Sequence, residues 1–179
     1  MEIEKLSLDA LNRIAKEDYI HIKKLDYYVV ADNLRSGQNV GSIFRSADAF
    51  ATSNIYLTGI SPTPPNKEVL KTALGATETV SWSQHLENNS LIEFFKDNNI
   101  KIIVVEQTTH SVLLHDFKPQ KGEKYALILG NEVDGVSMDF IKNADLCVEI
   151  PQAGTKHSLN VSVCAGILMW HMYDALKSI

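Results

Sequence analysis

The chain has 179 residues, of which 45% are hydrophobic and 22% are charged, and its formal net charge at pH 7 is −5. This length suffices for one domain with a sizeable core, and the negative net charge weakens a charge-based argument for nucleic-acid binding but leaves the question open. No apolar run approaches the ~20 residues that cross a bilayer, and the acidic N-terminus is unlike a secretory signal, so we expect a cytoplasmic protein.

The first half of the chain alternates between strand-like and helix-like patterns. Residues 1–26 are expected to form a short helical arm, in which Ser7 caps a helix with Leu8, Leu11, Ile14 and Ala15 on one face. After the arm we predict a strand at 27–31, a loop at 32–38, a helix with its apolar face between Val40 and Phe50, a strand at 54–58, a proline-containing loop at 60–66, a helix around 67–74 and a short strand at 79–82.

The second half continues the alternation. We predict a helix at 88–98, strands at 101–105 and 125–129 separated by an irregular segment at 107–123, a short helix at 138–143 capped by Ser137, a strand at 146–150, and a last apolar helix that begins at Ser158. This order predicts one α/β domain, residues 27–179, with a mostly parallel sheet and helices on both faces.

Cysteine and histidine usage indicates no metal site. Cys147 and Cys164 lie in apolar stretches, and no two of the six histidines have zinc-ligand spacing. We therefore expect two reduced, buried thiols and no bound metal.

Three loops that follow predicted strands have unusual compositions, and in such sheets ligands bind near the carboxyl ends of strands. The first, Asn39-Val-Gly-Ser-Ile-Phe-Arg45, begins a helix. Asn39 can cap that helix, Gly41 permits a close approach to its first turn, and Arg45 lies nearly two turns later on the same general side. Taken alone, this pattern is also that of a capped helix with a surface arginine.

The second loop is Leu129-Gly-Asn-Glu-Val-Asp-Gly135. Gly130 and Gly135 suit a tight turn whose backbone is open to a ligand, and Glu132 and Asp134 lie in that turn. The two acids would repel phosphate and no lysine follows, which excludes a phosphate-binding loop. Taken alone, an exposed acidic turn explains this spacing as well.

The third loop runs from Ile150 to Asn160, with Pro151 and Gly154 inside it. Ser158 and Asn160 lie at the start of the last helix, whose unpaired N–H groups suit hydrogen-bond acceptors. Taken alone, Ser158 is equally a helix cap and Asn160 a first-turn residue.

Together, the three loops resemble the signature motifs of the SpoU (TrmH-type) ribose methyltransferases of the SPOUT superfamily. The first matches Asn-x-Gly-x-x-x-Arg, the second Leu-Gly-x-Glu-x-x-Gly, and the third Ile-Pro-x-x-Gly-x-x-x-Ser-Leu-Asn-Val-Ser, here residues 39–45, 129–135 and 150–162. Each motif is of moderate specificity, but the three in this order are highly specific.

The resemblance implies a fold, an activity and an assembly. The fold would contain a deep C-terminal trefoil knot. The activity would be transfer of a methyl group from S-adenosylmethionine to a ribose 2′-hydroxyl of tRNA or rRNA, with S-adenosylhomocysteine as the product. The assembly would be a homodimer.

The resemblance also assigns roles to residues. The implied catalytic set is Arg45, Asn39, Glu132, Ser158 and Asn160. The implied cofactor-binding set is Leu129, Gly130, Ile150, Pro151, Ser158 and Leu159. Arg45 would act either as the base, when a substrate phosphate activates it, or as a phosphate clamp that stabilises developing alkoxide charge.

Three other functions remain open on the sequence. A base-methylating SPOUT relative is disfavoured by the Asn39–Arg45 motif, and a non-catalytic RNA-binding relative by the intact motif residues. An unrelated nucleotide-binding α/β protein is supported only if each motif is considered separately.

Overall fold

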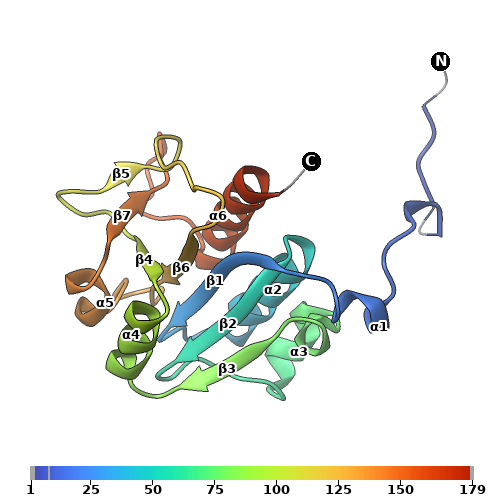
Figure 1. Cartoon of the computed structure of the whole chain (residues 1–179), viewed down its shortest axis with the longest axis horizontal. Helices are drawn as coiled ribbons and strands as arrows, with labels where there is room; N and C mark the ends of the chain where they lie inside the picture. The colour runs from blue at the N-terminus through green and yellow to red at the C-terminus, as the bar shows by residue number, and fades with distance from the viewer. Residues whose placement is uncertain (1–2, 8, 178–179) are drawn as a thin grey trace.

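The computed structural model describes residues 3–7 and 9–177, and it places seven strands in one sheet (Figure 1). Every pair of neighbouring strands is parallel, in the order β3-β2-β1-β6-β4-β7-β5. The strands are β1 (Leu25–Asp32), β2 (Thr52–Thr58), β3 (Trp82–His85), β4 (Ile100–Val105), β5 (Val112–Leu113), β6 (Lys124–Leu129) and β7 (Leu146–Glu149). The predicted α/β class with a mostly parallel sheet is confirmed.

Helices cover both faces of this sheet, as predicted. They are α1 (Lys16–Tyr19), α2 (Gly37–Ala49), α3 (Lys67–Ala73), α4 (Asn88–Asp97), α5 (Met138–Lys142) and α6 (Val161–Leu176), with 3-10 turns η1 (Asp9–Leu11) and η2 (Ala76–Glu78). Alternate residues of β1 enter opposite cores: Val29 packs with α2, α3 and α6, whereas Val30 packs with α4 and α5. Burial on both faces explains why the central strands are continuous apolar runs.

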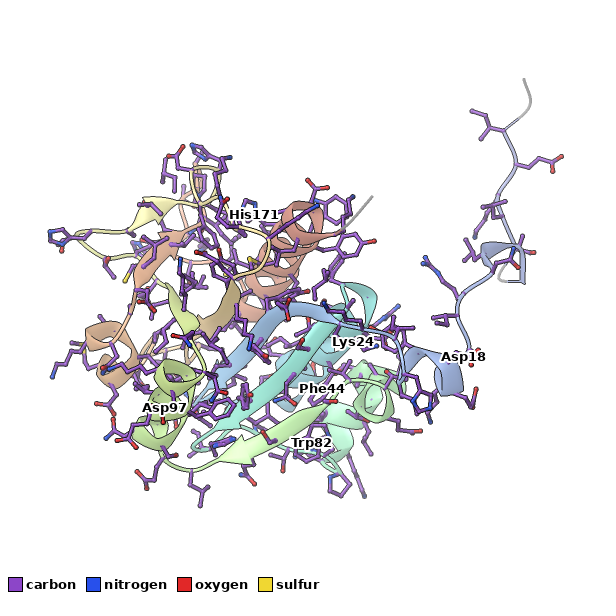
Figure 2. The ribbon with its side chains drawn as sticks, in the orientation of Figure 1. Asp18, Lys24, Phe44, Trp82, Asp97 and His171 are labelled. Atoms are coloured by element: carbon purple, nitrogen blue, oxygen red, sulfur yellow. The ribbon has the colours of Figure 1, made fainter. Side chains whose placement is uncertain are left out.

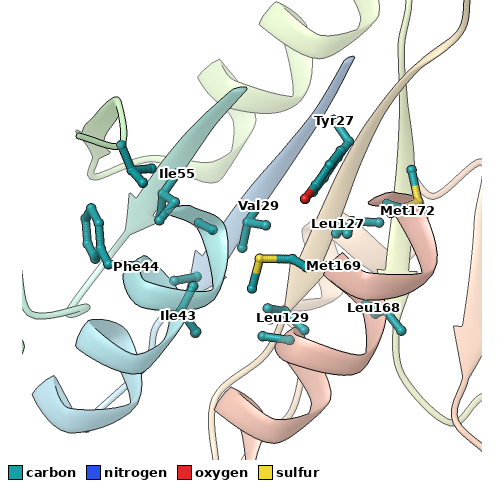
Figure 3. Packing of buried hydrophobic residues seen from close by; sticks show 14 of the residues in the cluster. Tyr27, Val29, Ile43, Phe44, Ile55, Leu127, Leu129, Leu168, Met169 and Met172 are labelled. Carbon is teal, nitrogen blue, oxygen red and sulfur yellow. The ribbon is translucent and has the colours of Figure 1, made fainter. Parts of the chain in front are cut away.

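The core between β1, β6, α2 and α6 fixes the two helices that carry the first and third motifs (Figure 3). Met169 of α6 and Ile43 of α2 are fully buried there, and the Thr52 hydroxyl contacts the Met169 sulfur at 3.6 Å. Phe44 packs edge-on against Trp82 with ring centroids 6.4 Å apart, which ties α2 to β3 (Figure 2). α2 and α6 are therefore held by packing far from their first turns.

Two predicted elements differ in the structure. The strand expected at 79–82 lies at Trp82–His85, because η2 occupies residues 76–78 and Trp82 pairs in register with Ile55. The irregular segment at 107–123 contains the short strand β5, which pairs with β7.

The N-terminal segment is not one amphipathic helix. Among its described residues only η1 and α1 are helical, and Figure 1 shows the chain before α1 running away from the sheet. Leu11 and Ile14 are exposed, so no packed face stabilises a longer helix, and short isolated helices are marginal in water. Leu8 lies outside the described residues.

No helix in the part of the chain that the structure describes is both long and apolar enough to cross a membrane. Because all strands are parallel, the loops after β1, β4, β6 and β7 leave the sheet at one edge. The three motifs therefore meet at this edge.

Candidate functional site

A cavity of about 570 Å³ opens at the carboxyl ends of β4, β6 and β7. Its apolar wall includes Leu129, Ile150 and Leu159. Its polar lining includes four carboxylates, those of Glu106, Glu132, Asp134 and Glu149, whereas no lysine or arginine lines it among the residues that the structure describes. The cavity therefore combines a flat apolar surface with a strongly negative potential.

Glu132 of the second motif binds the start of α2. Its carboxylate accepts hydrogen bonds from the backbone N–H of Arg35 at 2.9 Å, the N–H of Ser36 at 3.3 Å and the Asn39 side-chain amide at 2.8 Å. Partial burial raises the pKa of Glu132, but these bonds to the charged form outweigh it and hold the pKa below its usual value. At neutral pH, Glu132 is an anion that latches the second motif to the first.

Asn39 and Asn160 extend this latch to the third motif. Asn39 Oδ1 accepts a hydrogen bond from Asn160 Nδ2 at 3.1 Å, and Asn160 Oδ1 in turn accepts from the N–H of Ser162 at 2.9 Å and the N–H of Val163 at 3.4 Å. The Glu132 anion accepts only, so it fixes which end of the Asn39 amide faces it, and Asn39 then fixes Asn160. The three motifs thus form one directional network.

Two helix caps differ from the predictions. Ser36 caps α2 by accepting from the Asn39 N–H at 3.2 Å, so the predicted Asn39 cap is wrong and its side chain is free to bind Glu132. Asn160 caps α6, so the predicted Ser158 cap is also wrong. Ser158 instead precedes the helix and lines the cavity together with Leu159.

The motif glycines serve chain packing. A Cβ on Gly41 would lie 2.1 Å from the Thr72 hydroxyl, so the element that approaches the first turns of α2 is α3. A Cβ on Gly130 would lie 2.3 Å from the backbone of Gly135, and Gly135 has a φ of 71°. Gly130 is thus packed against the other end of its own turn, although it also lines the cavity.

The other predicted site residues fall outside the network. Pro151 lines a smaller hollow of about 260 Å³ beside the cavity, together with His157. Arg45 is exposed and has no hydrogen-bond or ion-pair partner in the described part of the chain. Six residues at 3.6 per turn place it about 120° around the helix from Asn39, so the prediction that the two residues share one side of the helix is wrong.

Cys164 and Cys147 are free, partly buried thiols. Burial, and then the Glu106 carboxylate, raise the pKa of the Cys164 thiol to about 11. Although Cys164 lines the cavity, it stays protonated at neutral pH and is a poor nucleophile.

Sequence reasoning missed two acidic residues at this edge. Glu106, at the end of β4, lines the cavity and accepts from the Val136 N–H at 3.2 Å. Asp32, at the end of β1, accepts from the Ser137 N–H at 2.7 Å. An acid directly after an apolar strand is the signal that could have identified both.

Known proteins are similar to this chain in both sequence and fold. The SpoU rRNA Methylase family model matches residues 26–170. An uncharacterized tRNA/rRNA methyltransferase of Borreliella burgdorferi is 31% identical over 158 residues, covering 87% of this chain and 67% of that protein. The 23S rRNA (guanosine-2′-O-)-methyltransferase RlmB of Neisseria meningitidis is 29% identical over 159 residues, covering 88% of this chain and 62% of RlmB.

A solved structure agrees with these matches. The AdoMet-bound rRNA methyltransferase from Sinorhizobium meliloti superposes with a TM-score of 0.80 at 25% identity, covering 89% of this chain and 61% of that protein. The chain spans about two thirds of the length of these relatives. Since the family model covers most of the chain and hydrogen bonds join the three motifs beside one cavity, the chain belongs to the SpoU rRNA Methylase family.

Proposed function

We propose that this chain transfers a methyl group from S-adenosylmethionine to a ribose 2′-hydroxyl of tRNA or rRNA and releases S-adenosylhomocysteine. The observation that carries the proposal is the network Glu132–Asn39–Asn160, which joins all three motifs at the rim of one cavity. RlmB of Neisseria meningitidis, which is 29% identical to this chain over 159 residues, is named as a guanosine-2′-O-methyltransferase. We place this reaction in the cytoplasm.

The chemistry of the cavity fits this cofactor. S-adenosylmethionine is a flat adenine joined to a chain that bears a sulfonium and an ammonium, against a single carboxylate. An apolar wall beside several carboxylates, without a lining cation in the described residues, suits such a net positive ligand. Leu129, Gly130, Ile150, Pro151, Ser158 and Leu159 would hold it, and when bound it supplies an electrophilic methyl group.

The chain's own residues would prepare the ribose hydroxyl. That hydroxyl is a weak nucleophile and must lose its proton as it reacts, so positioning and charge stabilisation carry much of the catalysis. A guanidinium is protonated at neutral pH and grips a phosphate through two parallel N–H groups. We therefore assign Arg45 to the phosphate beside the target ribose and to the developing alkoxide. Ser158 or a water would relay the hydroxyl proton to bulk solvent, and the network residues would orient both groups.

The assembly that we propose is a homodimer built on α6. Val163, Ile167 and Trp170 recur at helical spacing and are 51%, 37% and 51% exposed, forming an apolar stripe on the outer side of that helix. Apolar patches of this kind mark protein contacts, and a second copy offers an identical, self-complementary stripe. Ile167→Asp should convert a dimer to a monomer in light scattering, and a wild-type protein that is monomeric at micromolar concentration would contradict the assembly.

We also propose the C-terminal trefoil knot, with residues 27–179 as the catalytic domain and residues 1–26 as an arm. β7 lies beyond β4 in the sheet, yet the helix after it returns to pack with β1, β6 and α2. On that side α6 also meets the segment between β4 and β6, because the His171 ring contacts the Phe117 carbonyl at 2.8 Å (Figure 2). An experimental chain trace in which α6 reaches this place without passing through that segment would contradict the knot.

The decisive experiment uses methyl-labelled S-adenosylmethionine with total tRNA and, separately, rRNA, followed by alkaline hydrolysis. A 2′-O-methyl group blocks cleavage at its own phosphodiester, so the label should appear in dinucleotides. Label confined to mononucleotides would mean base methylation and would overturn the proposal. Calorimetric binding of the cofactor without transfer to either RNA would instead indicate a non-catalytic relative.

A further inference from the structure

Asp32, at the end of β1, is a fully buried carboxylate that the proposed reaction does not use. Its Oδ2 accepts the Ser137 N–H at 2.7 Å, and its Oδ1 accepts from the side chains of Asn33 at 2.9 Å, Thr58 at 3.1 Å and Asn88 at 3.5 Å. No lysine or arginine contacts it among residues 3–7 and 9–177. Since a buried carboxylate without partners is strongly unfavourable, the hydrogen bonds alone must satisfy this one.

The neighbouring Asn33 has an unusual backbone that the Asp32 carboxylate helps to hold. Asn33 has a φ of 55°, and its carbonyl accepts a hydrogen bond from Asn131 Nδ2 at 2.6 Å. Its side-chain oxygen accepts the Ile60 N–H at 3.3 Å, while Asp32 takes its side-chain N–H. A left-handed residue keeps its conformation only where surrounding contacts over-determine it, and here three segments do so.

The turn after β1 is consequently joined to the second-motif loop at three successive levels. Asp32 binds Ser137 at the far end of the loop, and the Asn33 carbonyl binds Asn131 at its start. Between these points, Glu132 of the loop accepts hydrogen bonds from the backbone N–H groups of Arg35 and Ser36 in the turn after β1. Asn131 also fixes the tip, because its Oδ1 accepts from the Val133 N–H at 2.8 Å.

From this arrangement we infer that Asp32 is a positioning residue for methyl transfer. It holds both ends of the second-motif loop so that the Glu132 carboxylate reaches Asn39 without further ordering when substrate binds. The inference rests on the proposed function for its kinetic consequence, but its structural consequence, the rigidity of the loop, does not depend on any activity.

Asp32→Asn tests this with little change in volume. The amide can accept at only one of its ends, so its N–H₂ group faces either the Ser137 N–H or the Asn33 side-chain amide as donor to donor, and either mismatch weakens the hold on the loop. We expect faster hydrogen exchange in peptides covering 129–137 and 33–36, and a turnover lowered about tenfold. Thr58→Val is the matched control, because it removes a donor from the same carboxylate on the side of β2 and should leave both the loop and the turnover unchanged.

The double variant with Glu132→Gln separates positioning from general destabilisation. If Asp32 acts through Glu132, adding Asp32→Asn to Glu132→Gln should lower turnover by less than twofold more, whereas independent effects would multiply. Multiplied effects, or unchanged exchange at 129–137, would overturn the inference. If the wild-type chain transfers no methyl group, the exchange measurement still decides it.

Asn131→Asp provides the same test if Asp32→Asn does not fold. It keeps the oxygen that holds the loop tip, but it replaces the donor to the Asn33 carbonyl with a charged oxygen that faces that carbonyl. We expect the same faster hydrogen exchange in peptides covering 129–137 and 33–36, and a double variant with Glu132→Gln whose turnover is less than twofold below that of Glu132→Gln alone. An Asn131→Asp protein that exchanges and turns over like wild type would overturn the inference.

Discussion

Asn160 has two roles that one isosteric substitution can separate. Its Oδ1 caps α6 by accepting from the Ser162 and Val163 N–H groups, and its Nδ2 donates to Asn39 Oδ1. Asn160→Ala removes both roles. Asn160→Asp keeps an oxygen at the cap but replaces the donor with a second acceptor, so only the link to Asn39 is lost.

The expected magnitudes differ for the two roles. Loss of an N-cap costs ~1 kcal/mol, which lowers the melting temperature of a chain of this size by roughly 2–4 °C, so Asn160→Ala should melt that much lower. Asp is among the best capping residues and its charge suits a helix N-terminus, so Asn160→Asp should melt within about 1 °C of wild type.

The rate of methyl transfer should depend on the hydrogen bond between Asn160 and Asn39. In Asn160→Asp two oxygens would face each other where the hydrogen bond measured 3.1 Å. Asn39 cannot relieve this by rotating its amide, because the Glu132 anion holds its N–H₂ end at 2.8 Å. In the free protein the exposed Asn160→Asp side chain can shift away from Asn39, so the melting temperature changes little. Bringing the two side chains back together for methyl transfer costs ~1.5–3 kcal/mol, which is roughly a 10- to 100-fold loss of single-turnover rate.

The assay pairs thermal unfolding with single-turnover methyl incorporation into RNA. Asn66→Asp is a matched control, because Asn66 caps α3 through the Glu68 N–H at 2.9 Å and does not line the cavity. It should leave the rate unchanged. An Asn160→Asp protein with the wild-type rate would refute the directional network, and one that melts as low as Asn160→Ala would refute the account of the cap.

Three further substitutions address the charged residues. Arg45→Lys should leave the melting temperature unchanged, because the side chain is exposed. It should lower methyl transfer at least ~100-fold, since lysine lacks the planar, forked guanidinium. Near-normal turnover would contradict both roles of Arg45. Glu132→Gln should lower the melting temperature most at neutral pH. The folded-state pKa of Glu132 lies below the ordinary 4.5, so the difference in melting temperature between Glu132→Gln and wild type should shrink as the pH falls below 4.5. A difference that stays constant down to about pH 3 would contradict the role of Glu132 in joining the two motifs. In calorimetry, Glu106→Gln should weaken binding of S-adenosylmethionine by roughly three- to tenfold. It should weaken binding of S-adenosylhomocysteine by less, because that ligand is less positively charged. Equal losses of affinity for the two ligands would contradict an electrostatic role of Glu106.

Local patterns predicted the elements of this fold but not all of their ends. The centres of β1, β4 and β6 are apolar runs, as strands buried on both faces are, and these strands were predicted within two residues. Helix starts were harder to predict. The cap of α2 is Ser36, three residues before the predicted Asn39, and the cap of α6 is Asn160, two residues after the predicted Ser158.

The contacts that build the site join residues about 100 positions apart, and no local pattern encodes them. Glu132 binds the turn after β1 only because β1 and β6 are neighbours in the sheet, with Ala31 beside Leu129. Spacing could not show that Gly41 makes room for α3, or that Asp32 reaches Ser137. Family resemblance identified the motif residues, but the residues that hold them in place had to come from three-dimensional contacts.

The network and Arg45 divide the site into an ordered half and an open half. The series of hydrogen bonds that begins at Glu132 ends at the first N–H groups of α6, so its donors and acceptors are paired with one another without a substrate. The Arg45 guanidinium, by contrast, has its five N–H donors unengaged by the described residues. Water satisfies the donors of this exposed group in the free protein, and in the proposed reaction the phosphate beside the target ribose would replace that water. If Arg45 stabilises the transition state through that phosphate, as proposed, truncating the substrate at that phosphate should reduce the rate of transfer more than the affinity.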